Sequence, residues 1–401
     1  MVPALRQAFN AAFTKEKYAA FLADLHSGYP GAIEFRVAET PVFISKDFSK
    51  KVMDTCEHII DVITGPQFKQ LTNRSIPAGE NVPGENDYCH MIAFDFGICI
   101  NAQNELEPQL IEMQGFPTLF GFQVYLSDTL RKHFDIPDNY TPYPAPYDRE
   151  SFLTNFKEVV LGELPAENVI LLEIKPHEQK TRIDFYCTKD YLGIQPVCIT
   201  ELIQEGKKLY YINAATKKKT PIARIYNRII FDDLHTQKES LGPHVDITQE
   251  LDVEWVPHPN WFYRISKFTL PLIRHPYVPA TFYLNEIKQV PADLENYVLK
   301  PLFSFAGQGV VIDLTRQDIE QVKDPENWIL QRKVTYADVI DTPDIPAKVE
   351  IRMMYTWKKG AARPEAVINL ARLSKGKMIG VRYNKDKEWV GGSVCLFEGH
   401  E

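Results

Sequence analysis

Apolar runs near position 90 are broken at only a few points by polar side chains. Residues 90–100 are almost continuously apolar except for Asp95, and this pattern predicts a buried strand. Residues 108–117 predict another strand, which carries Glu112 and Gln114. Side chains two positions apart on a strand lie on one face of the sheet, and the short polar turn between the strands predicts an antiparallel pair. Asp95, Glu112 and Gln114 are therefore expected to converge.

A strand–helix–strand pattern follows after a connection rich in proline and tyrosine. Residues 168–174 read as an apolar strand, 179–192 as an amphipathic helix and 196–200 as a second strand. This order is typical of a βαβ unit and predicts a small, partly parallel sheet with helices on its faces. Residues 208–212 and 221–231 predict further strands of this second domain.

The last of these strands carries Arg224, Tyr226 and Arg228 at alternating positions, so the three side chains share one face. They are either a contact for an anionic substrate or the solvent face of an edge strand. Both interpretations stay open at this point.

The stretch 297–311 predicts a β-hairpin around a glycine-containing loop. A β-branched and aromatic run ends at Lys300, and a second such run follows Gly309. Gly307 and Gly309 permit positive φ, and the backbone N–H groups of such a loop can bind an anion beside the lysine charge. The alternative is an ordinary hairpin with a surface lysine.

Regular elements are also expected outside these segments. Amphipathic or apolar patterns predict helices at 46–64, 120–134 and 315–322, and strands at 328–334, 348–357, 365–373 and 377–383. The C-terminal region is therefore expected to be an antiparallel sheet with few helices.

Composition limits the classes of function. A chain of 401 residues with 44% hydrophobic and 24% charged residues is typical of a globular protein of two or three domains. The net charge of −8 argues against general nucleic-acid binding. No apolar run approaches eighteen residues, so no membrane association is expected, and a cytoplasmic location is predicted. The six cysteines lack Cys-x-x-Cys spacing, so neither a zinc site nor a disulfide framework is expected.

The polar side chains of the first two strands suit a hard cation. Magnesium takes oxygen ligands, uses one or two carboxylates, and leaves the rest of its octahedron to water and phosphate. Asp95, Glu112 and Gln114 would supply such ligands. The alternative is a strand pair with solvated acids, although Asp95 within an apolar run does not fit that alternative well.

Taken in order from Lys267, the C-terminal segments resemble the ATP-grasp ligases. The matching residues are Lys267, Lys300 with Pro301, the loop containing Ser304, Gly307, Gln308 and Gly309, then Gln331, and the strand arginines Arg352 and Arg372. The two strands that hold magnesium in that superfamily are absent from the C-terminus and are matched instead by the strands with Asp95, Glu112 and Gln114. This order resembles a circularly permuted ATP-grasp protein, most closely the glutathionylspermidine-synthetase-like group. The segment 224–229, Arg-Ile-Tyr-Asn-Arg-Ile, also resembles sequences of that group.

The resemblance implies an α+β or α/β chain: a permuted ATP-grasp fold with an inserted βαβ domain. Residues 1–150 would supply the magnesium strands, 151–260 the α/β domain, and 261–401 the lysines, the glycine loop and the antiparallel sheet. ATP and Mg²⁺ are the implied cofactors, held by the lysines, the glycine loop and Gln331 for the nucleotide, and by Asp95, Glu112 and Gln114 for the metal. Arg352 and Arg372 are the implied catalytic residues.

The implied reaction joins a carboxylate to an amine through an acyl phosphate, with small-molecule or peptide substrates. Gln114 stands where the group usually has Asn, and its longer side chain moves the amide oxygen by about an ångström. An ATP- or peptide-binding protein without ligase activity is therefore the alternative, and phosphoryl transfer without ligation is a third hypothesis. No amidase domain of the kind fused to some members of that group is recognised in these residues, so amidase activity is not expected.

Overall fold

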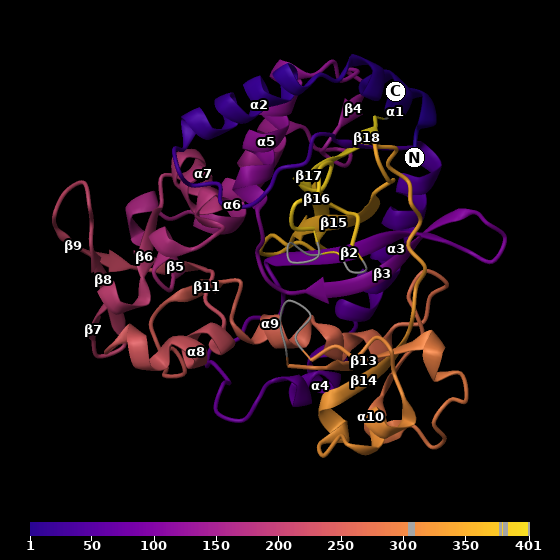
Figure 1. Ribbon diagram of the computed structural model, residues 1–401. Helices are drawn as coiled ribbons and strands as arrows, with labels where there is room; N and C mark the ends of the chain where they lie inside the picture. Colours follow the sequence, from indigo (N-terminus) through magenta and orange to yellow (C-terminus); the bar gives the residue numbers. More distant parts are fainter. Residues whose placement is uncertain (304–308, 377–378, 380–383, 400–401) are drawn as a thin grey trace.

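An antiparallel sheet of five strands lies at the centre of the molecule, in the order β17-β16-β15-β2-β3 (Figure 1). The computed structural model describes residues 1–303, 309–376, 379 and 384–399. The strand bounds are β2 Met91–Ile100, β3 Leu106–Gln114, β15 Lys348–Thr356, β16 Glu365–Ser374 and β17 Gly391–Ser393. These bounds confirm the strands predicted at 90–100, 108–117, 348–357 and 365–373. β15 pairs with both β16 and β2, so segments far apart in the chain share one sheet.

Helices cover both faces of this central sheet. α3 (Lys46–Ile63) packs on one face, where its apolar stripe meets alternate sheet residues such as Phe94 and Met353. α5 (Phe120–His133) and α6 (Arg149–Leu161) pack on the other face, against Met354. Successive buried side chains of β15 therefore pack into two hydrophobic cores, one on each face of the sheet. The remaining helices of the N-terminal region are α1 Pro3–Ala12, α2 Lys15–Gly28 and α4 Phe68–Leu71.

The chain end forms strands that the sequence patterns did not predict. β18 (Cys395–Glu398) pairs in parallel with β1 (Val42–Ile44) and antiparallel with β4 (Tyr140–Thr141), and β17 extends the central sheet beside β16. The predicted strand at 377–383 lies almost wholly outside the described residues.

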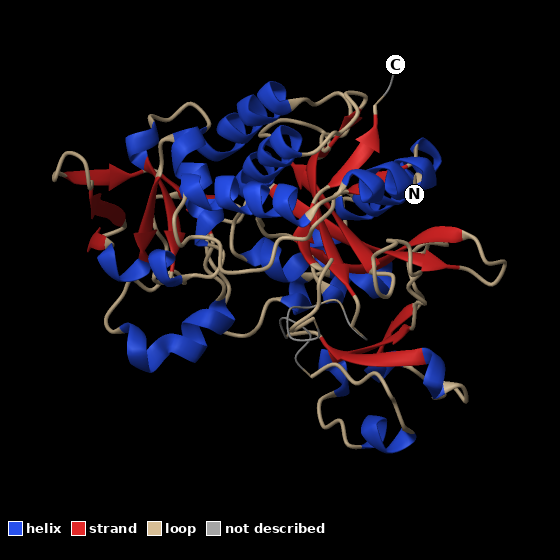
Figure 2. Ribbon diagram, turned by 45° about the horizontal axis from the view of Figure 1, so that its top comes forward, coloured by secondary structure: helices blue, strands red, loops and turns tan. Residues whose placement is uncertain are grey.

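The α/β domain projects to one side of the central sheet (Figures 1 and 2). Its four strands are all parallel, in the order β11-β10-β5-β6, and α7 connects β5 to β6, which confirms the predicted βαβ unit. A second sheet, β7-β8-β9, is antiparallel. The bounds are β5 Val169–Glu173, α7 Arg182–Leu192, β6 Gln195–Cys198, β7 Ile203–Glu205, β8 Lys208–Ile212, β9 Lys219–Ile222, β10 Arg224–Asn227, α8 Phe231–Leu241 and β11 Glu254–Val256.

A three-stranded antiparallel sheet, β12-β14-β13, lies below the central sheet in Figure 1. Its elements are α9 Asn260–Arg264 just before it, then β12 Thr281–Tyr283, β13 Tyr297–Pro301, α10 Arg316–Glu320 and β14 Trp328–Arg332. The predicted hairpin at 297–311 is confirmed in part, because Leu299 and Val311 exchange two antiparallel backbone hydrogen bonds. β13 pairs along its length with β14, and the segment after the loop makes only an isolated bridge between Leu299 and Val311.

Among the described residues, no helix is both long and apolar enough to cross a membrane.

Candidate active site

One face of the central sheet carries most of the predicted polar residues. Asp95 lies opposite both Glu112 on β3 and Arg352 on β15 in the strand register. Residues directly opposite on neighbouring strands project to the same face. Glu350 is two positions from Arg352 and lies opposite Arg372 on β16, so all five side chains share this face.

Four of these side chains form a buried ion network, here called the arginine cluster: Asp95, Glu350, Arg352 and Arg372. Asp95 is 2% exposed. Its Oδ1 accepts from Arg352 Nε at 2.5 Å, and its Oδ2 accepts from Arg352 Nη2 at 2.5 Å and from Arg372 Nη2 at 2.6 Å. Arg372 Nη2 also lies 2.8 Å from Glu350 Oε2. Two carboxylates and two guanidinium groups are thus brought together, so their formal charges cancel.

The cluster controls the protonation of its own carboxyl groups. Burial acts to raise the pKa of Asp95, but the charges of Arg352 and Arg372 overcome it and hold that pKa below its usual value. Burial raises the pKa of Glu350, which lies further from Arg352 and accepts a hydrogen bond from the Tyr336 hydroxyl at 2.5 Å. Asp95 is therefore the more firmly ionised of the two acids.

Glu112 and Gln114 lie at the end of β3, beyond the cluster and half-buried. The strand end is fixed because the Gly115 N–H donates to the Ile265 carbonyl at 2.8 Å. A Cβ at Gly115 would overlap the carbonyl oxygen of Trp261, so only glycine allows this close approach to α9. The glycine thereby places the Gln114 side chain beside the segment that carries Lys267.

The two lysines come from the small sheet and its entry. Lys300 ends β13, and its Nζ donates to Gln331 Oε1 on the neighbouring β14 at 2.5 Å. The Gln331 Nε2 group donates in turn to the Thr281 hydroxyl at 3.2 Å. Lys267 is buried, and its Nζ donates to the Pro301 carbonyl at 3.0 Å. The structure therefore brings Lys267, Lys300 and Gln331 together.

Both lysines have a depressed pKa. Burial lowers the pKa of Lys300 to about 8, with Lys267 adding a like charge, while Glu112 and Glu350 act in the opposite direction. Burial also lowers the pKa of Lys267, against the attraction of Glu112 and Asp232. With a pKa of about 8, Lys300 is still mostly cationic at neutral pH.

A cavity of about 240 Å³, here called the lysine pocket, joins residues from all three parts of the chain. Its lining contains Glu112, Gln114 and Lys267 together with two further acids, Glu80 and Asp232. Burial and the nearby Glu80 raise the pKa of Asp232. Ser266 and a set of aromatic and apolar groups complete the walls: Pro77, Met113, Phe262, Tyr263, Leu302 and Phe303.

The loop that carries Glu80 is held by α9. The Arg264 guanidinium forms two hydrogen bonds to Glu85, from Nε at 2.5 Å and from Nη2 at 2.9 Å. Asn260 hydrogen-bonds the loop backbone at Val82, and the Tyr263 hydroxyl donates to Glu80 itself. The long loop between β2 and the helices before it is thus fixed as one wall of the lysine pocket.

The donor set fits a magnesium ion only in part. Glu112 and Gln114 present a carboxylate and an amide oxygen to the pocket. Magnesium binds to so few protein ligands where phosphate and water supply the rest. Asp95 does not fit: three of its roughly four acceptor positions are occupied, and two guanidinium charges repel a cation there. Within the described residues, no group of three or more His, Cys, Asp or Glu side chains could hold a metal.

The predicted glycine loop falls mostly outside the described residues, which exclude Ser304, Gly307 and Gln308. Gly309 is described and has a φ of 70°, a conformation that favours glycine.

The α/β domain places a second set of charges near this face. In a parallel sheet, ligands bind at the carboxyl ends of two neighbouring strands whose connections lead to opposite sides of the sheet. Here these two strands are β5 and β10. Glu173 ends β5, is 7% exposed, and burial raises its pKa to about 8. Arg228 follows β10, donates to the Thr118 carbonyl at 3.0 Å and lies over the Phe116 ring at 5.5 Å, two residues beyond Gln114.

β10 is an inner strand and Arg224 and Tyr226 are buried, so the solvent-face interpretation of the 224–228 alternation is wrong; Arg228 is buried as well. Its Nη1 lies 3.4 Å from Oδ2 of Asp184, a fully buried acid whose other oxygen accepts from the backbone N–H groups of Gly121 and Phe122 at the start of α5. Burial raises the pKa of Asp184 to about 6. Arg224 is also buried and pairs with Glu254 at 3.0 Å.

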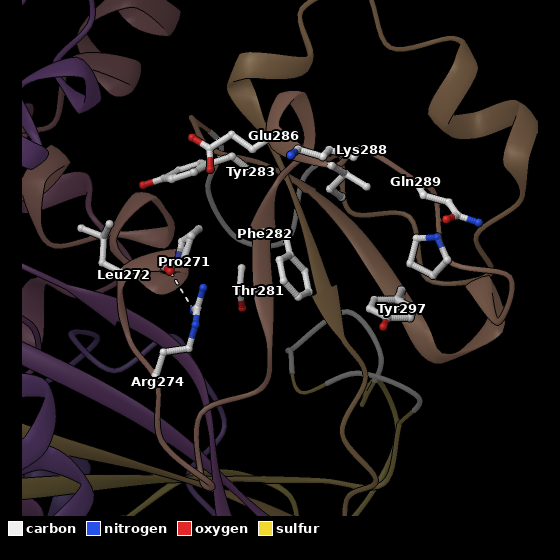
Figure 3. Close-up of a pocket in the computed structure, with 12 residues that line it drawn as sticks. Pro271, Leu272, Arg274, Thr281, Phe282, Tyr283, Glu286, Lys288, Gln289 and Tyr297 are labelled. Carbon is white, nitrogen blue, oxygen red and sulfur yellow. Dashed lines mark hydrogen bonds between the residues drawn. The ribbon is translucent and has the colours of Figure 1, made fainter.

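A larger cavity, of about 480 Å³, surrounds the edge strand β12 and contains none of the predicted site residues (Figure 3). Arg274, Phe282, Lys288 and Tyr297 are among its lining residues, and it touches the site only through Thr281.

Several residues of the site were missed by the sequence patterns. Glu350 could have been found, because strand alternation places it on the face of Arg352. Glu80, Asp232 and Asp184 had no local signal, since they join the site through residues that are distant in the sequence.

No protein-family model matches the chain, and no curated protein sequence matches it either. Among solved structures, the apo form of a glutathione synthetase-like effector from Globodera pallida is similar, with a TM-score of 0.58 and 11% sequence identity. The match covers 98% of this chain and 99% of that chain. At this identity the likeness shows a shared fold: the chain has a mixed α and β architecture similar to that of a glutathione synthetase-like protein.

Proposed function

We propose that this protein is an ATP- and Mg²⁺-dependent carboxylate–amine ligase built on a circularly permuted ATP-grasp fold. The observation that carries the proposal is the lysine pocket. There, Glu112 and Gln114 from the central sheet meet Lys267 from the segment that leads into the small sheet. Lys300 of the small sheet interacts electrostatically with Glu112. The strand order supports the permutation, because β2 pairs directly with β15 and β3 pairs with β2 in the same sheet.

Each residue has a role that follows from its charge and place. Lys267 and Lys300 neutralise the phosphates of ATP, and Gln331, which orients Lys300, lies beside the nucleotide. Glu112 and Gln114 would hold the magnesium ion, which when bound neutralises charge on the transferring phosphoryl group. Arg372, with a side chain 36% exposed, stabilises the negative charge that develops on the substrate.

The proposed reaction has two steps. A substrate carboxylate oxygen attacks the γ-phosphorus of ATP, and the bond to ADP breaks to give an acyl phosphate and ADP. The neutral amine then attacks the acyl carbon, inorganic phosphate leaves, and the amine proton passes to solvent. Arg228, at the crevice of the parallel sheet, is suited to bind a carboxylate of an amino-acid-like or peptide substrate.

One observation favours a second candidate, an ATP- or peptide-binding protein without ligase activity. With Asp95 enclosed by guanidinium groups, Glu112 is the one predicted carboxylate that lines the pocket. The reduced donor set, together with Gln114, would suffice for nucleotide binding and leave turnover slow.

The test is ADP release by the full chain with Mg·ATP and pooled amino acids or short peptides, with hydroxylamine present to trap an acyl phosphate as a hydroxamate. The ligase predicts substrate-dependent ADP release and hydroxamate, both lost in Glu112→Gln. Nucleotide binding with no ADP above background for any acceptor would instead support the binding protein. Failure to bind nucleotide would reject both.

A further inference from the structure

Asp95 lies at the position where a metal ligand was expected, but its contacts are those of an arginine anchor. Its carboxylate accepts three charge-assisted hydrogen bonds, two from Arg352 in a fork geometry and one from Arg372. Such paired N–H bonds fix both the position and the plane of a guanidinium group. At 2% exposure, Asp95 has little surface left for another ligand.

The two arginines differ in what they can reach. Arg352 is 12% exposed in its side chain, and its remaining Nη1 group donates to the Thr118 hydroxyl at 3.1 Å, at the start of α5. Arg372 is 36% exposed in its side chain, and its Nη2 group contacts both Asp95 Oδ2 and Glu350 Oε2. Glu350 is in turn fixed by the Tyr336 hydroxyl. Arg352 is therefore enclosed, and Arg372 is held in place with part of its surface open.

We propose that Asp95 is a positioning residue that holds Arg372, through a carboxylate shared with Arg352, and that it does not ligate magnesium. The inference rests on the proposed ligase function, because Arg372 is the group that meets developing charge. Glu112 and Gln114 remain the protein ligands of the metal. The lowered pKa of Asp95 agrees with this role, because the charges of Arg352 and Arg372 keep its carboxylate ionised.

The metal dependence of nucleotide binding separates the two roles. Binding of a non-hydrolysable ATP analogue to the full chain is measured over a range of Mg²⁺ concentrations for the wild type, Asp95→Asn and Glu112→Gln. The proposal expects Glu112→Gln to raise the half-saturating Mg²⁺ concentration at least about tenfold, and Asp95→Asn to leave it within about twofold. A comparable rise in both variants would overturn the proposal.

A second readout does not depend on nucleotide at all. Thermal unfolding is measured for Asp95→Asn, Arg352→Gln and the double variant. Asp95→Asn leaves one buried guanidinium charge uncompensated and should lower Tm by at least about 5 °C, whereas the double variant removes that excess charge and should recover much of the loss. Additive losses in the cycle would contradict an anchor role. This arm remains informative if the protein binds no nucleotide, an outcome that would reject the proposed function instead.

Failure of Asp95→Asn to fold is also decisive. If the double variant folds where Asp95→Asn does not, the anchor is supported. If Arg352→Gln folds but the double variant does not, Asp95 has a role independent of the arginine and the proposal fails. In an active enzyme, Asp95→Asn should lower kcat for ADP release at least about tenfold at an unchanged KM for ATP, as expected when Arg372 is misplaced.

Discussion

The arginine cluster and the lysine pocket share one face of the central sheet but treat charge in opposite ways. In the cluster, Asp95 and Glu350 are matched by two arginines in direct ion pairs. Lys267 lines the pocket, and Lys300 beside it donates to the uncharged amide oxygen of Gln331 and has its pKa lowered to about 8 by burial. Buried charges that are paired with one another hold a structure in one arrangement. Buried lysines with a lowered pKa are typical of a site that binds an anionic ligand.

Removing residues 1–150 should break both regions at once. That segment supplies β2 and β3, and with them Asp95 and Glu112, while its loss exposes an edge of β15 and opens the core shared with α3. We expect a chain of residues 151–401 to be insoluble or unfolded by circular dichroism. A soluble, cooperatively folding 151–401 that binds Mg·ATP normally would refute the permuted arrangement.

The cluster should be the more costly place to remove a single charge. Arg352→Ala leaves Asp95 buried with half of its partners, and we expect a loss of about 3–5 kcal/mol in the free energy of unfolding, measured with urea. Arg363→Ala is the matched control, because Arg363 also pairs with two carboxylates, Glu57 and Asp61, but at the surface. Its expected loss is below about 1 kcal/mol. Equal losses in the two variants would show that burial does not distinguish these pairs.

Glu173 extends the comparison to a buried acid with incomplete pairing. Burial raises its pKa from 4.5 to about 8, opposed by a hydrogen bond from the Ile174 N–H and by the charge of Arg228, and assisted by Asp233. Between these two values the unfolded chain loses a proton that the folded protein keeps, so the penalty on folding grows as pH rises from 4.5 to 8 and is complete above 8.

Glu173→Gln should therefore be more stable than the wild type at pH 8, by a few kcal/mol at roughly 1.4 kcal/mol per pKa unit, and the gain should vanish near pH 4.5. Urea unfolding at several pH values measures this difference. A gain that is constant with pH would mean that the Glu173 carboxyl is not responsible.

The smallest expected effect is that of Gln114→Asn. The substitution shortens the side chain by one methylene. Because water and phosphate would supply the remaining magnesium ligands, Mg·ATP affinity should change by no more than about threefold. Gln109→Asn, on the same strand but outside the pocket lining, is the matched control. A large loss confined to Gln114→Asn would show that the amide reach is critical for the metal.

Strand alternation predicted the main strands of the sheets, and the apolar run around Asp95 argued against a solvated acid, which agrees with its 2% exposure. The identity of the partners of Asp95 was not predictable, because Asp95 and Arg352 are brought together by strand pairing across 257 positions. The hairpin at 297–311 was predicted as the main pairing of β13, but the longer pairing is with β14, on the edge opposite the Leu299–Val311 bridge. β17 was missed because Gly391 and Gly392 have low strand propensity and are ordered by β16 beside them.

Calorimetric titration of Mg·ATP into the wild type, Lys267→Ala and Lys300→Ala tests the central claim most directly. Each substitution removes a charged contact to phosphate, worth about 1.5–3 kcal/mol, so we predict affinities roughly ten- to a hundredfold weaker than that of the wild type. Lys288→Ala is the matched control, since Lys288 is exposed and lies in the cavity beside β12 instead, and it should bind as the wild type does. Unchanged affinity in both Lys267→Ala and Lys300→Ala, or no Mg·ATP binding by the wild type, would contradict the assignment of the lysine pocket as a nucleotide site.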